Sequence, residues 1–175
     1  MRTRPIGSII GAIGGLVFVL ANAGSVPGSL IWRIAAAVAF GAIIWFVVLR
    51  GPEIDQVPPS RAALRTYGIS VVAMGVAIPV GATVINNVFD QPNAVVVWVV
   101  FVVGAHFWPF AHTFALPVFR WLSVSLIIVA IIGAVPTLAA NSAAAAGWTG
   151  IVAGFVLLLF SAVGPRLTQR SPAAP

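Results

Sequence analysis

The chain has 175 residues, of which 61% are hydrophobic and only 7% are charged, and its mean hydropathy is +1.11. Soluble domains carry roughly 25% charged residues, so this composition excludes a water-soluble globular protein. The formal net charge of +6 comes from arginine alone. Because these arginines fall at the ends of apolar segments, they indicate membrane topology and give no reason to expect nucleic acid as a partner.

Six apolar segments predict an all-α polytopic membrane protein, in which one domain is a bundle of six transmembrane helices. The predicted spans are residues 6–23, 30–49, 62–85, 94–110, 118–135 and 144–163. Proline and glycine mark the connections at 27–28, 51–52, 58–59, 92, 117, 136 and 164–165. A β-barrel is excluded because residues 95–103 are apolar at every position, whereas barrel strands alternate. Residues 166–175 are predicted to form a disordered cytoplasmic tail.

The first span carries a stripe of small residues, with Gly7, Gly11 and Gly15 spaced four apart. On a helix such a stripe allows another backbone to approach closely. It predicts either a homo-oligomer contact or, as the favoured interpretation, packing against another span of the same chain. Gly150 and Gly154 form a similar stripe in the last span, so the two end helices are expected to pack on each other.

The same segment has the features of a secretory signal peptide. A basic start precedes an apolar core and the small residues Ala21-Asn22-Ala23. The favoured interpretation is an uncleaved first span, because five more spans follow. Cleavage after Ala23 stays open as the alternative.

The arginines predict the orientation of the bundle. With the N-terminus in the cytoplasm, only Arg33 falls toward the outer side, and this bias indicates that both termini are cytoplasmic. The arginines on the cytoplasmic side are then Arg2, Arg4, Arg50, Arg61, Arg65, Arg120, Arg166 and Arg170.

The third span contains Gly75, Pro79 and Gly81. Proline removes a backbone hydrogen bond and crowds the preceding turn, so a kink near mid-membrane is predicted. Broken helices at this depth occur in transporter binding sites, but simple proline kinks are the more ordinary interpretation.

The outer ends of the second and third spans each carry a charge, Arg33 and Asp90. If the two spans are neighbours, Asp90 can accept a charge-assisted hydrogen bond from Arg33. The alternative is that Arg33 extends alone toward the headgroups.

The fourth span ends in the cluster His106, Trp108, Pro109 and His112. Six residues place the two histidines about 120° apart on a helix, so they do not predict a metal or haem site. His106 is expected to make a polar contact inside the bundle, to Ser70, Thr66 or a carbonyl group, and His112 is expected at the cytoplasmic interface.

No pattern in the chain predicts an enzyme or a cofactor. The three carboxylates, Glu53, Asp55 and Asp90, fall in connections, whereas proton-coupled pumps keep ionisable groups within the membrane. The chain has no cysteine, no Gly-x-Ser-x-Gly motif, no phosphate-binding Gly-Lys loop and no Rossmann fingerprint.

The string Gly104-x-His106-Phe107-x-Pro109-x-Ala111 resembles a string in small uncharacterised bacterial integral membrane proteins with six spans. The resemblance brings no activity with it. The location that we expect is a bacterial cytoplasmic membrane, which the chain crosses several times. The leading hypothesis is therefore a non-enzymatic accessory or scaffold subunit, which associates with the bilayer and with its own copies or another membrane subunit. The alternative is a small facilitative transporter or channel.

Overall fold

The computed structural model describes residues 2–3, 6–51, 54–55, 60–114 and 116–168. It confirms an all-helical architecture, in which six helices are long and apolar enough to cross a membrane. They are α1 (Ile6–Asn22), α2 (Ser29–Ile43), α3 (Arg61–Asn87), α4 (Ala94–Thr113), α5 (Pro117–Ala140) and α6 (Ala143–Thr168).

Short elements complete the described part of the chain. A 3₁₀ turn η1 (Ala23–Ser25) follows α1, and a π-helical segment η2 (Ile44–Leu49) continues α2. The strands β1 (Arg2–Thr3) and β2 (Ile54–Asp55) form a two-residue antiparallel pair.

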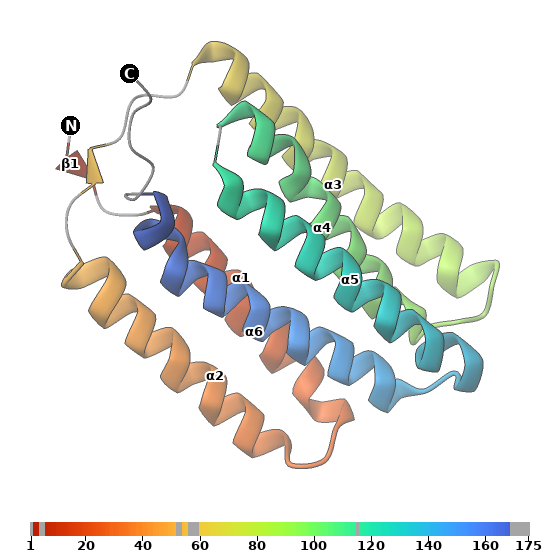
Figure 1. The fold of residues 1–175 in the computed structure, drawn as a ribbon. Coiled ribbons are helices and arrows are strands. Elements are labelled where there is room, and N and C mark those ends of the chain that lie inside the picture. The colour runs from red at the N-terminus through yellow and green to blue at the C-terminus, as the bar shows by residue number, and fades with distance from the viewer. Residues whose placement is uncertain (1, 4–5, 52–53, 56–59, 115, 169–175) are drawn as a thin grey trace.

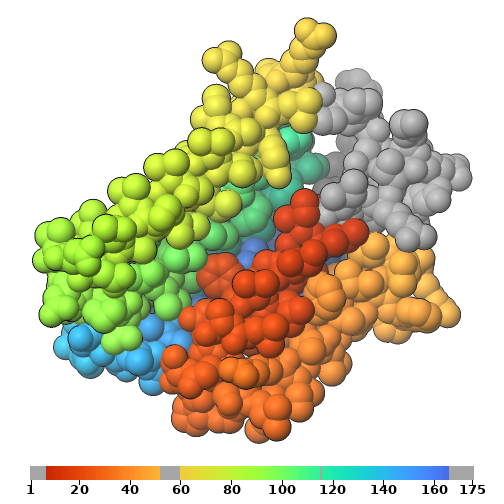
Figure 2. Space-filling model, turned by 180° about the vertical axis from the view of Figure 1, so that it is seen from behind, coloured from red at the N-terminus to blue at the C-terminus, as the bar shows by residue number. Residues whose placement is uncertain are grey.

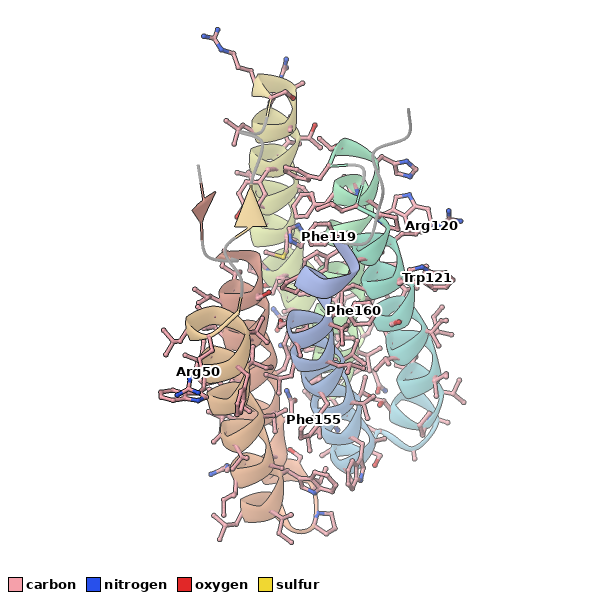
Figure 3. All side chains as sticks on the ribbon, turned by 60° about the vertical axis from the view of Figure 1, so that its left-hand side comes forward. Arg50, Phe119, Arg120, Trp121, Phe155 and Phe160 are labelled. Atoms are coloured by element: carbon pink, nitrogen blue, oxygen red, sulfur yellow. The ribbon has the colours of Figure 1, made fainter. Side chains whose placement is uncertain are left out.

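Helix α6 lies at the centre of the arrangement (Figure 1). It packs antiparallel on α1, so the start of α1 and the end of α6 lie at the same end of the bundle. One hydrophobic cluster joins α1, α2 and α6, and a second joins α4, α5 and α6. Phe155 belongs to the first and Phe160 to the second, and both point from α6 into the bundle (Figure 3).

Helix α3 is peripheral. It packs on α4, and Figure 2 shows it along one edge of the molecule. None of the apolar window that qualifies it as a span is buried, whereas half of the corresponding window of α6 is. Helix α3 is therefore held to the bundle along one side only.

Polar residues form the turns. Ser60 caps α3 by accepting a hydrogen bond from the backbone N–H of Ala63 at 3.1 Å. Asn141 ends α5 in the left-handed conformation, with φ 42°. The amide of Asn93 donates to the carbonyl oxygen of Asn141 at 2.8 Å and to its side-chain oxygen at 2.9 Å, which joins two connections at one end of the bundle.

The predicted ends of the last two spans are wrong. Pro136 and Pro165 were expected to mark connections, but both lie inside helices, as α5 continues to Ala140 and α6 to Thr168. Proline is tolerated within transmembrane helices because neighbouring groups can satisfy the carbonyl it leaves free. The helical part of the predicted tail is therefore 166–168, and its remainder, 169–175, lies outside the described residues.

Candidate functional site

A serine and a histidine meet where α3 lies on α4. The Oγ atom of Ser70 is 3.1 Å from Nδ1 of His106 and 3.1 Å from the carbonyl oxygen of the same residue. The structure thus gives His106 the polar contact that the sequence predicted, and Ser70 is the partner.

Both contacts can be hydrogen bonds at the same time in only one tautomer of the neutral His106 ring. A hydroxyl has one proton, and Ser70 donates it to the carbonyl oxygen. The contact with Nδ1 is then satisfied when Nδ1 carries a proton and donates it to Ser70 Oγ. In the neutral ring, Nε2 is left as a hydrogen-bond acceptor.

Aromatic rings surround the histidine on α4. The His106 ring lies 4.8 Å from the centre of Phe107 and 4.7 Å from that of Phe110, in an edge arrangement with the latter. Tyr67 of α3 stacks on Phe110 at 5.4 Å. The hydrogen bonds of His106 within the described residues involve Nδ1 and the carbonyl oxygen, and none involves Nε2.

A groove of about 460 Å³ runs between α3 and α4 and reaches His106. Its lining is mostly apolar, and its polar members are Thr66, Ser70 and His106. Because α3 packs on α4 along one side only, the groove opens to the outer side surface of the helix bundle. The surrounding surface is the lipid-facing one if the helices span a bilayer.

The predicted cluster at the end of α4 divides into two parts. His106 and Pro109 line the groove, whereas Trp108 and His112 do not. Trp108 is 42% exposed, and its ring lies 6.0 Å from that of His112. Among the described residues, no three His, Cys, Asp or Glu side chains lie together in a way that could hold a metal ion.

Helix α3 continues through Pro79 without interruption. Gly81 makes room for the Trp98 ring, whose Nε1 donates a hydrogen bond of 3.0 Å to the carbonyl oxygen of Ala77. Gly75, in contrast, has no neighbouring atom within 4 Å of the place where a Cβ would lie. The Trp98 contact was not predicted, because a tryptophan near a span end is also explained by the membrane interface.

The glycine stripes of the first and last spans face each other, as predicted. A Cβ on Gly15 would lie 2.6 Å from the carbonyl oxygen of Gly154, and a Cβ on Gly11 would meet Ser161 Oγ. Gly150 similarly makes room for Asn22. The stripe supports packing within the chain, although Gly7 itself has no neighbour within 4 Å.

The predicted pairing of Arg33 with Asp90 is wrong. Helices α2 and α3 lie on opposite sides of the bundle (Figure 1), because α2 packs on α1 and α6 while α3 packs on α4. Arg33 lies beside Gly24 in η1, and Asp90 forms the turn after α3 with φ 51°. The consecutive helices α2 and α3 are therefore not neighbours in space.

Five arginines near helix ends are exposed, namely Arg33, Arg50, Arg61, Arg65 and Arg120. Arg120 and Trp121 at the start of α5, and Arg50 at the end of η2, carry their side chains outward (Figure 3). The guanidinium of Arg50 lies 4.8 Å from the centre of the Trp45 ring, a cation–π distance.

Comparison of the chain with protein-family models, with curated proteins and with solved structures finds no match. Function therefore has to be argued from the geometry of the bundle and of the α3–α4 groove.

Proposed function

We propose that the chain is a multi-pass protein of a bacterial cytoplasmic membrane with both termini in the cytoplasm. Six apolar helices and the positions of the arginines support this orientation. Reporter fusions after Arg170 and within residues 25–29 test it. We expect cytoplasmic activity from the first fusion and periplasmic activity from the second, and a periplasmic C-terminus contradicts the orientation.

In this membrane the chain acts as a non-enzymatic accessory or scaffold subunit that is held together by helix packing. The observation that carries the proposal is the interior around α6, where the buried side chains of the described residues are aliphatic or carry hydroxyl groups. Thr149 and Ser161 donate their hydroxyl protons to carbonyl oxygens of their own helix. Such an interior stabilises a bundle and supplies no group for proton transfer.

Helix α3 is the surface that we assign to a protein partner, because it is apolar and attached along one side only. A photo-crosslinking amino acid at Val72, which is exposed on α3, tests this assignment in cells. The matched control carries the same amino acid at Ile132, which is equally exposed on α5.

We expect a discrete protein adduct from position 72 and only lipid adducts from position 132. Lipid adducts at both positions contradict the assignment of α3. A discrete protein adduct at position 132 and none at position 72 would show that the partner binds α5 and not α3.

A second function, a small facilitative transporter or channel, is favoured by the groove that reaches His106. Its test is the flux of small neutral solutes into proteoliposomes. If the flux exceeds that of protein-free liposomes and His106→Phe abolishes the excess, the protein is a transporter or channel and not an accessory subunit. Equal flux in both vesicles excludes this second function for the solutes used.

A further inference from the structure

The α3–α4 groove has the dimensions and the polarity of a ligand site. Its volume of about 460 Å³ lies within the range of small-molecule pockets, roughly 300–1,000 Å³. Thr66 and Ala77 both line it, so it extends about 16 Å along α3. That length is about half the thickness of the hydrocarbon core of a bilayer.

The polar groups of the groove lie toward one end. Thr66 and Ser70 are one helical turn apart on α3, and His106 faces Ser70 from α4. Toward the other end the lining is apolar and includes Met74, Ala77 and Phe101. A matching ligand has an elongated apolar body with one polar group at its end.

The positions of the protons in the Ser70–His106 pair determine which polar group of a ligand can form a hydrogen bond with His106. When Ser70 donates its proton to the carbonyl oxygen of His106, Nδ1 must carry the ring proton to bond Ser70, so Nδ1 is not an acceptor for a ligand. Nε2 of His106 has no partner in the described part of the chain, and it is not sealed from the surface. As an acceptor it requires a donor from the ligand, and an O–H group supplies one whereas an ether or a ketone oxygen does not.

We infer that the groove binds a membrane-dissolved molecule with an elongated apolar body and a terminal hydroxyl group, which donates a hydrogen bond to Nε2 of His106. The apolar body lies along α3 and α4 and enters sideways from the bilayer. The inference concerns a small molecule and does not depend on the accessory role or on a protein partner.

The test uses the full chain in phosphatidylcholine vesicles and two photoreactive probes. One is a 16-carbon alcohol with a diazirine in its chain, and the other is the methyl ether of the same alcohol. After irradiation, labelled peptides are mapped by mass spectrometry. We expect the alcohol to label the groove segments of α3 and α4 roughly 2- to 10-fold more than the ether does, as one net hydrogen bond predicts.

Two variants locate the binding. His106→Phe keeps a ring but removes the acceptor, so labelling by the alcohol should fall to the level of the ether. Ala73→Phe fills the groove and leaves the Ser70–His106 pair intact, so labelling by both probes should fall. Ala37→Phe, at an exposed position of α2, is the matched control and should label like the unchanged protein.

Three outcomes overturn the inference. Equal labelling by the alcohol and the ether would show that no hydrogen bond to Nε2 contributes to binding. Labelling spread evenly over the exposed faces of all six helices shows ordinary contact with lipid. Unchanged labelling in Ala73→Phe, with the variant folded by circular dichroism, places the probe outside the groove.

Discussion

The contact between α1 and α6 and the contact between α3 and α4 both involve helices that contain glycines, but they are built differently. Between α1 and α6 the glycines face backbone, since Gly15 and Gly154 lie against each other's carbonyl oxygens. On α3, Gly68 and Gly75 face nothing within 4 Å, and hydrogen bonds from Ser70 and Trp98 join the helices. Glycine therefore lets backbone approach backbone between α1 and α6, whereas the closely packed glycine of α3, Gly81, makes room for the ring of Trp98.

The largest expected effect comes from placing a bulky side chain in the α1–α6 contact. Gly15→Leu should lower the free energy of unfolding by roughly 3 kcal/mol, because the nearest atom is the carbonyl oxygen of Gly154, and this backbone group of α6 cannot rotate away. Thermal unfolding or steric trapping in bicelles measures the change. An unaltered unfolding free energy would show that α1 and α6 do not pack this closely.

A smaller loss is expected from Gly11→Leu. Here the neighbour is the side chain of Ser161, which can change rotamer but then loses its 2.7 Å hydrogen bond to the carbonyl oxygen of Leu157. We expect a loss of about 1–2 kcal/mol in the same assay. A loss as large as that of Gly15→Leu would mean that the helices are closest at Gly11.

The α3–α4 contact should respond weakly to the loss of its hydrogen bond. Ser70→Ala is expected to cost about 0.6 kcal/mol, the mean value of hydrogen bonds between membrane helices, and to speed amide exchange in α3 alone. Thr83→Ala is the matched control, because that hydroxyl donates to Pro79 within the same helix. If the two variants exchange alike, Ser70 does not hold α3 to α4.

The smallest effect is expected from Gly75→Leu. With no atom within 4 Å of the new Cβ position, the side chain can extend from α3 without displacing a neighbour. The change in unfolding free energy should stay within about 0.5 kcal/mol. A large loss would reveal that another surface covers Gly75 in the membrane.

The sequence predicted the six helices and the α1–α6 contact because both follow from local patterns. An unbroken apolar stretch predicts a span, and the spacing of Gly11, Gly15, Gly150 and Gly154 predicts two faces that can meet. The ends of α5 and α6 were missed because Pro136 and Pro165 end helices more reliably in water than among membrane helices.

The site was only partly predictable. The polar partner of His106 was among three candidates, but the choice of Ser70 depends on which side of α3 lies on α4. The apolar residues of α3 occupy all its sides, so the sequence does not indicate that side. The Arg33–Asp90 pairing failed for a related reason, since it assumed that consecutive spans are spatial neighbours.

The central position of α6 has a consequence for the order in which the bundle is made. In the membrane that we propose for this chain, α1 is inserted before the other five helices and α6 after them. The glycine face of α1 therefore has no partner until α6 is inserted. Chains that stop before α6 keep this face uncovered and lack the helix common to both hydrophobic clusters. A membrane protease that recognises unpacked helices can thus distinguish an incomplete chain from a finished one.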